Sequence, residues 1–163
     1  PIIYSQQMGK QLSCGCSSKG HDTYNYFDKN PDYANRDTIL YLVEIRKQYQ
    51  KIGIAFNVKR RFRAEGETEI FYERILPRAK ARCVEYLALM WTADKQAKLI
   101  PKKFAEMDGS TELRDQLNID ETINMIEQLA NESEEMTWKE LWGKYGLSTA
   151  AEPQYVSIPK DIP

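Results

Sequence analysis

Hydrophobic residues cluster in three short segments in the middle of the chain, with polar residues between them. These segments are residues 39–45, 50–55 and 69–76, and each is rich in β-branched or aromatic side chains. Runs of this kind predict β-strands. The first two are joined by the four residues 46–49, a length that suits a hairpin. Gly53, inside the second strand, predicts either a bulge or a close approach of another group to the backbone.

Two helices are predicted in the same part of the chain. Asn57 can cap a short helix over residues 58–63. Pro77 stands where a longer helix would start, because proline is tolerated in the first turn. Residues 78–93 form the body of that helix, with apolar residues repeating on one side.

Further helical patterns follow after a break. Residues 119–131 carry apolar side chains on one face, and Asp120 can cap this segment. Residues 137–140 have the form of a capping box that starts a short helix, which Gly146 can end. The pattern as a whole predicts an α/β fold: a small mixed sheet, made of a hairpin plus a third strand, flanked by helices and followed by a helical C-terminal extension.

The domain organisation follows from this pattern and from the composition. The chain has 163 residues, of which 42% are hydrophobic, enough to bury the core of one domain of ordinary size. Residues 1–38 lack a clean period and predict an irregular N-terminal arm. Residues 39–105 are expected to form the α/β domain. Residues 106–163 are expected to form an acidic helical extension with an extended, proline-containing tail.

Charge is distributed unevenly along the chain although the net charge is only −1. Residues 44–82 hold eleven basic and five acidic side chains, whereas residues 106–163 hold four basic and thirteen acidic ones. A basic middle favours an anionic partner, and DNA is the one we expect. The acidic part is either a solvated face, a segment that competes for the basic middle, or a docking face for a protein partner.

Four polar residues stand at positions that suit phosphodiester chemistry: Tyr41, Lys51, Arg61 and Glu85. Such chemistry needs a group that directs water, positive charge that stabilises the phosphate, and a carboxylate that can hold a divalent metal. A phenol titrates near pH ~10 and would need help to act as a base, which a neighbouring lysine can give.

Each of the four also has a simpler interpretation. Tyr41 can be an ordinary strand aromatic, and Arg61 lies in a basic run that can simply be solvated. Glu85 is the most informative of the four, because an acid among apolar helix positions is costly unless it is paired. Arg82 or Arg78 can supply that pairing for structural reasons alone.

The motifs that carry these residues resemble the GIY-YIG nuclease superfamily over about residues 39–92. Ile39-Leu40-Tyr41 and Lys51-Ile52-Gly53 stand for the two tripeptides, residues 57–61 for the arginine helix, and Glu85 for the glutamate of the later helix. The literal first tripeptide is absent, and lysine replaces the second tyrosine. Ala55 stands where a small hydroxyl residue is common, and Glu65 about where a histidine often follows.

The resemblance implies a metal-dependent DNA endonuclease. In that assignment Lys51 and Arg61 bind the scissile phosphate, Tyr41 orients or deprotonates water, and Glu85 holds Mg²⁺ or Mn²⁺. The alternative is a catalytically silent module of the same kind that binds nucleic acid or a protein partner as a regulator.

The remaining candidates concern zinc and the compartment. Cys14, Cys16 and His21 could hold zinc, but Cys-x-Cys is tighter than the usual spacing and a fourth ligand is needed, so unbound thiols are favoured. Three cysteines do not form a disulfide framework, which favours a reducing, cytoplasmic location. No apolar run approaches the length of a membrane span, so no membrane association is expected.

Overall fold

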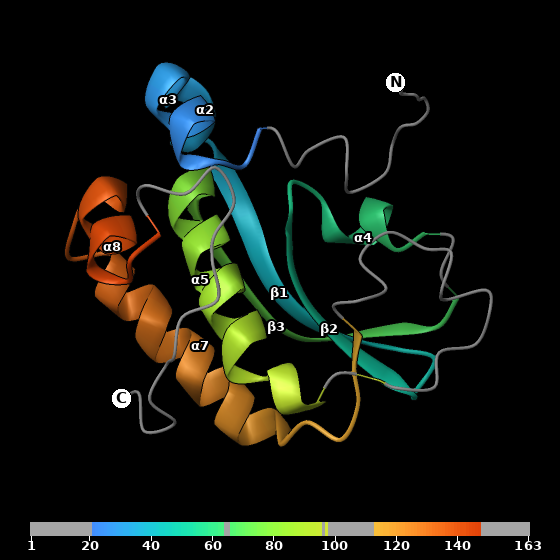
Figure 1. Ribbon diagram of the computed structural model, residues 1–163. Coiled ribbons are helices and arrows are strands. Elements are labelled where there is room, and N and C mark those ends of the chain that lie inside the picture. The colour runs from blue at the N-terminus through green and yellow to red at the C-terminus, as the bar shows by residue number, and fades with distance from the viewer. Residues whose placement is uncertain (1–20, 64–65, 96, 98–112, 148–163) are drawn as a thin grey trace, which may run out of the picture.

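Four antiparallel strands form the central sheet of the computed structural model, which describes residues 21–63, 66–95, 97 and 113–147 (Figure 1). They are β1 (Asp37–Ile45), β2 (Tyr49–Ala55), β3 (Thr68–Pro77) and β4 (Leu113–Arg114), in the order β3-β1-β2-β4. The expectation of a mixed sheet is therefore wrong for the described strands. β2 and β3 do run in the same direction, but β1 lies between them and pairs with both in the antiparallel sense.

A tight turn joins β1 to β2, as the sequence predicts. The amide of Gln48 donates to the carbonyl of Ile45 at 3.0 Å, and the two residues between them have positive φ angles, 53° at Arg46 and 58° at Lys47. Positive φ at both central residues gives the hairpin the twist that its strands need. The register irregularity lies between Leu42 and Val43 in the pairing of β1 with β3, and not at Gly53.

Three helices cover one face of the sheet (Figure 1). They are α5 (Arg78–Trp91), α7 (Ile119–Ser133) and α8 (Trp138–Lys144). α5 lies against the sheet, and α7 and α8 pack on α5. All three agree with the predicted segments.

The caps of these helices agree with the sequence analysis except at one position. The side chains of Thr137 and Glu140 form the predicted capping box of α8. The cap of α7 is Asn118 and not Asp120, because the Asn118 side chain accepts the amide of Glu121. Asp120 lies inside the first turn, where its negative charge faces the positive end of the helix dipole.

The N-terminal arm is less irregular than expected in its described part. Residues 24–34 form two short helices, α2 (Tyr24–Lys29) and α3 (Pro31–Ala34). Thr23 caps the first through the amide of Tyr26, and a proline opens the second. A third short helix, α4 (Val58–Arg61), follows β2 and is capped by the predicted Asn57, and a 3₁₀ turn, η1 (Ala93–Lys95), follows α5.

One apolar core contains residues from all three expected segments: the N-terminal arm, the α/β domain and the C-terminal extension. Phe27 of α2, Leu87 of α5 and Trp142 of α8 are all fully buried in it, together with strand residues of the central sheet. The indole nitrogen of Trp142 donates to the carbonyl of Ala79 at 2.8 Å, which satisfies its one polar atom. The described parts of the arm and of the extension are therefore integral to the domain.

Candidate functional site

A second, smaller apolar cluster lies on the opposite face of the sheet, and Tyr41 is part of it. Tyr41 is 1% exposed and pairs across the hairpin with Gly53. A Cβ atom at Gly53 would lie 2.4 Å from the Tyr41 hydroxyl oxygen and 2.7 Å from Cζ. The phenol therefore lies directly over the glycine backbone. The predicted close approach at Gly53 is confirmed, and its cause is the ring of Tyr41.

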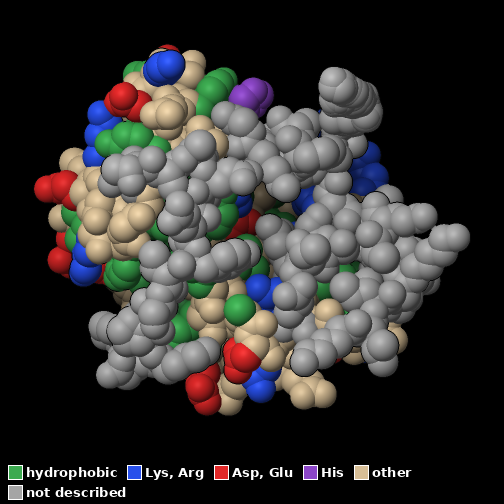
Figure 2. Space-filling view, in the orientation of Figure 1, with side chains coloured by type: hydrophobic (Ala, Val, Ile, Leu, Met, Phe, Trp, Pro, Cys, Tyr) green, Lys and Arg blue, Asp and Glu red, His purple; other side chains and the backbone are tan. Residues whose placement is uncertain are grey.

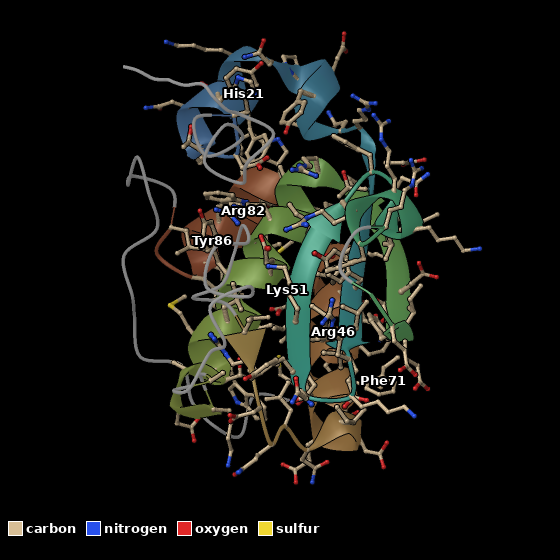
Figure 3. The ribbon with its side chains drawn as sticks, turned by 90° about the vertical axis from the view of Figure 1, so that its right-hand side faces the viewer. His21, Arg46, Lys51, Phe71, Arg82 and Tyr86 are labelled. Atoms are coloured by element: carbon tan, nitrogen blue, oxygen red, sulfur yellow. The ribbon has the colours of Figure 1, made fainter. Side chains whose placement is uncertain are left out.

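Lys51 points to the same face of the sheet as Tyr41. It pairs directly with Val43, a member of the smaller cluster, so it is the diagonal neighbour of Tyr41 on the adjacent strand. Its side chain is 3% exposed. Figure 3 labels Lys51 on β2, the strand beside α5 in that view.

Arg61 reaches this face through α4. Its guanidinium carbon lies 5.2 Å from the centre of the Phe62 ring, and that ring contacts the ring of Tyr41 edge-on at 5.3 Å. Asn57 fixes the start of the helix by accepting the amide of Arg60 at 2.9 Å. The hairpin and α4 together bring Tyr41, Lys51 and Arg61 to one side of the sheet.

Glu85 lies on α5, and two contacts show which part of β2 it faces. Near the start of α5, the guanidinium of Arg78 lies 4.6 Å from the centre of the Phe56 ring, just past the end of β2. Four residues after Glu85, the carbonyl of Leu89 accepts a hydrogen bond from Arg114 at 3.0 Å. Arg114 lies on β4, which pairs with the start of β2. The helix face that carries Glu85 therefore runs along the β2 edge of the sheet.

These contacts also show roughly where Glu85 lies along the strand. Arg114 is paired with Gln50, so Leu89 lies within the reach of one arginine side chain of the start of β2. Four residues of helix correspond to roughly 6 Å, and roughly 6 Å is about two residues of strand. Glu85 therefore lies one helical turn nearer the middle of β2, on the helix that covers the face of the sheet opposite Tyr41. Tyr41, Lys51 and Arg61 lie on one side of the sheet, and Glu85 lies along the β2 edge on the other.

Glu85 forms an ion pair with Arg82, one of the two partners that the sequence suggested for it. Nη1 of Arg82 donates to Oε1 of Glu85 at 2.5 Å, and Nη2 donates to the hydroxyl of Tyr86. Burial by itself would lower the pKa of Arg82, but Glu85 and Tyr86 more than offset this and the pKa is raised. Nε of Arg82 is buried and has no hydrogen-bond partner in the described part of the chain. Figure 3 shows Arg82 and Tyr86 side by side on α5.

A buried ion pair next to this cluster was not foreseen from the sequence. Arg78 binds Asp22 through two hydrogen bonds, of 3.0 and 2.9 Å, and both side chains are buried. Tyr33 adds its hydroxyl to the same carboxylate at 3.1 Å. Burial, followed by the charge of Asp22, raises the pKa of Tyr33 to about 12. No sequence signal marks Asp22, because it lies 56 residues from its partner.

Arg46 is a further cation that sequence reasoning passed over. A Cβ atom at Gly66 would lie 2.8 Å from Nε of Arg46, so the guanidinium rests on the backbone of the loop before β3. Gly66 itself has φ +89°, a conformation that favours glycine. The turn between β1 and β2 thus carries positive charge toward the loop that follows α4.

The described residues contain no group of three or more His, Cys, Asp or Glu side chains that could hold a metal ion. Cys14 and Cys16 of the zinc hypothesis lie outside the described residues. His21 stacks on Tyr26 with ring centres 4.6 Å apart. Cys83 lies in the core and burial raises the pKa of its thiol, so the thiolate form is disfavoured.

The acidic helix α7 lies on the face of the sheet opposite Tyr41. Glu127 and Glu134 both pair with Arg74 at 2.8 Å, and Arg74 sits opposite Leu40, which faces the larger core. Glu132 pairs with Lys144 of α8. Three of the described acidic residues, Glu127, Glu132 and Glu134, are therefore ion-pair partners on the helical side. That the extension competes for the basic site stays a prediction.

Comparison with known proteins gives no relative: no family model, curated protein or solved structure matches this chain. In the part of the chain that the structure describes, no helix is long and apolar enough to cross a membrane.

Proposed function

We propose that this protein is a metal-dependent DNA endonuclease that hydrolyses a phosphodiester through a GIY-YIG-like site. The observation that carries the proposal is the position of the Tyr41 hydroxyl over Gly53, with Glu85 on the helix that runs along the β2 edge. Lys51 is the diagonal neighbour of Tyr41, and Arg61 reaches the same region through Phe62. These residues come from four separate elements, β1, β2, α4 and α5, and a basic surface that is merely solvated would not need them near one another.

The chemistry assigned to each residue follows from its side chain. Lys51 and Arg61 carry positive charge that stabilises the phosphate as negative charge builds up on it. Arg61 adds directed N–H donors, which suit phosphate oxygens. Tyr41 orients the attacking water by a hydrogen bond, and it would have to be a phenolate to take the proton of that water. The glycine beneath the phenol keeps that hydroxyl in place, because no side chain competes for the space.

Glu85 fits a divalent metal as a site with one carboxylate. Mg²⁺ commonly binds proteins through one or two carboxylates and completes its shell with water and substrate phosphate, so a cluster of acids is not needed. Mg²⁺ or Mn²⁺ held there would neutralise charge on the phosphate and the leaving oxygen. Oε1 of Glu85 accepts from Arg82, so Arg82 must withdraw, at least in part, when the metal binds.

That same ion pair supports a second candidate function, a catalytically silent module that binds DNA. A guanidinium already neutralises the only acidic candidate of the site, and it does so within 2.5 Å. In this case Lys51, Arg61 and Arg82 supply the positive charge of an anion-binding site, and Glu85 serves to hold Arg82.

Nicking of supercoiled plasmid by the purified protein in Mg²⁺ or Mn²⁺ separates the two functions. We expect metal-dependent nicking that Tyr41→Phe and Glu85→Gln each reduce by about 100-fold or more. Tyr41→Phe keeps the ring over Gly53, so it removes the hydroxyl and preserves the packing. If the protein binds DNA but does not nick it at any metal concentration, and the Arg82→Gln variant does not nick it either, the silent module is the function.

Two neighbouring arginines give a matched control for the phosphate site. Arg61 approaches the Phe62 ring, whereas Arg60 is exposed and lies about 100° away around α4. Arg61→Ala should weaken binding to DNA by about 1–3 kcal/mol, and Arg60→Ala by much less. Equal losses in a fluorescence-anisotropy titration would indicate a diffuse basic patch.

A further inference from the structure

A row of aromatic rings connects α2 to the end of β2, and the proposed function makes no use of it. We call this row the aromatic ridge; its members are His21, Tyr26, Tyr33 and Phe56. His21 stacks on Tyr26 at 4.6 Å, Tyr26 contacts Tyr33 edge-on at 5.4 Å, and Tyr33 contacts Phe56 at 6.2 Å. The ridge joins residues that are far apart in sequence into one surface.

Both ends of the aromatic ridge are open to solvent. Phe56 is 39% exposed. His21 is exposed at the other end, and it is the histidine seen at the end of the molecule formed by α2 and α3 in Figure 2. Between them, the hydroxyl of Tyr33 is fixed by Asp22. The centre of the ridge is rigid, and its ends can be reached by a ligand.

Phe56 forms a flat cationic surface with Arg36. The guanidinium carbon of Arg36 lies 4.0 Å from the centre of the Phe56 ring, and the Arg36 side chain is exposed. Arg78 also lies over this ring, but its charge is compensated by Asp22. The exposed positive charge beside the Phe56 ring is therefore that of Arg36. Aromatic rings and arginine planes are the surfaces on which proteins stack unpaired nucleic-acid bases.

This surface is continuous with the proposed phosphate site. Phe56 is followed directly by Asn57, which caps α4, and α4 carries three consecutive basic residues, Lys59 to Arg61. A single DNA strand whose phosphates contact α4 would bring its bases to Phe56. A regular duplex cannot use such a surface, because its bases are already stacked on one another.

We propose that the aromatic ridge binds unpaired bases, so that the preferred ligand of this protein is single-stranded DNA or DNA with an unpaired segment beside the scissile phosphate. The cleavage part of this inference rests on the proposed function, whereas the binding part does not. Stacking on Phe56 and Arg36 supplies the preference for unpaired bases, and α4 supplies the attraction for phosphate.

The test compares a fluorescein-labelled oligothymidylate with a duplex of equal length, titrated with the full chain at low salt in EDTA. We expect tighter binding of the single strand. Phe56→Ala should weaken single-strand binding by about 5- to 100-fold and change duplex binding little. Phe56→Tyr should retain the preference because it keeps the ring. Ile75→Ala is the matched control, since Ile75 is an apolar side chain of β3 that is 62% exposed and lies outside the ridge.

Arg36→Gln gives a second variant that does not depend on packing, because the side chain is exposed. It should weaken single-strand binding more than duplex binding. The proposal is overturned if both ligands lose equal affinity, or if neither variant loses any. It is also overturned if single strands do not bind at low salt, and that result would leave the ridge as a surface for a protein ligand. Nicking is measured separately, so a protein that fails to cut but loses single-strand binding in Phe56→Ala would still support the ridge.

Discussion

The two faces of the sheet are built differently. The face covered by α5, α7 and α8 carries a cluster of twenty buried apolar residues among those described, and the opposite face carries nine. On the helical face two buried polar groups have partners: the indole nitrogen of Trp142 donates to a backbone carbonyl, and Arg78 pairs with Asp22. On the smaller face a tyrosine hydroxyl and a lysine lie next to one another. The helical face therefore buries more apolar side chains, and the smaller face places Tyr41 and Lys51 among fewer of them.

This difference explains where a site can form in a domain of this size. A buried polar group costs free energy unless it is hydrogen-bonded or paired, so a face with fewer packed apolar side chains has more room for such groups and their partners. The hairpin belongs to both faces, because its alternate residues point to opposite sides. Leu40 and Leu42 anchor β1 in the larger core, and Tyr41 between them points to the smaller one. The larger core therefore fixes the position of β1, the strand that carries Tyr41.

The largest expected effect of a single substitution is at Trp142. Trp142→Ala should lower the free energy of unfolding by about 3–5 kcal/mol, because it empties a fully buried site and removes the hydrogen bond to Ala79. Chemical denaturation of the variant measures this. A loss below about 1 kcal/mol would mean that α8 is a separate appendage, and the contrast between the two faces would then be smaller than described.

A smaller effect on stability, but a larger one on activity, is expected at Gly53. Gly53→Ala would put a methyl group 2.4 Å from the Tyr41 hydroxyl, so the ring must move. We expect a loss of about 1–3 kcal/mol in unfolding free energy and loss of nicking. Gly143→Ala is the matched control, since nothing lies within 4 Å of a Cβ there and alanine favours a helix by about 0.5–1 kcal/mol. If Gly53→Ala behaves like Gly143→Ala, the ring is free to move and the site is not rigid.

The smallest expected effect is a pH dependence at Tyr33, where α2 and α3 meet the sheet. The pKa of Tyr33 is raised from its ordinary value of 10.0 to about 12, mainly by burial and then by Asp22. Between these two pH values the unfolded chain releases the proton and the folded chain keeps it. Stability supported by the neutral phenol is thus complete below about pH 10 and is lost as the pH rises toward 12.

Urea unfolding at pH 9 and pH 11 checks this expectation. Tyr33→Phe should lose less stability over that interval than the unmodified chain does, because one of its titrating phenols is gone. Other tyrosines with raised pKa values, such as Tyr86, contribute equally to both proteins and cancel in the comparison. The same slope in both proteins would show that the hydroxyl of Tyr33 is not held by Asp22.

Much of the local structure follows from the sequence because it depends on residues close together in the chain. The hairpin, the short helix capped by Asn57 and the capping box at Thr137 all have local causes: turn length, side-chain caps and apolar period. The errors have local causes as well. The true cap of α7 lies two residues before the expected Asp120, and the helices α2 and α3 are too short to show a period.

The sequence by itself indicated candidates for phosphodiester chemistry and the elements on which they lie. Only the tertiary structure decided how these elements combine, since β1 between β2 and β3 makes the sheet antiparallel and α5 runs along the β2 edge. It also decided that Glu85 bonds to Arg82, and that Asp22 meets Arg78 across 56 residues. The physical reason is that turns and caps are short-range, whereas burial and ion pairing depend on which distant surfaces the chain brings together.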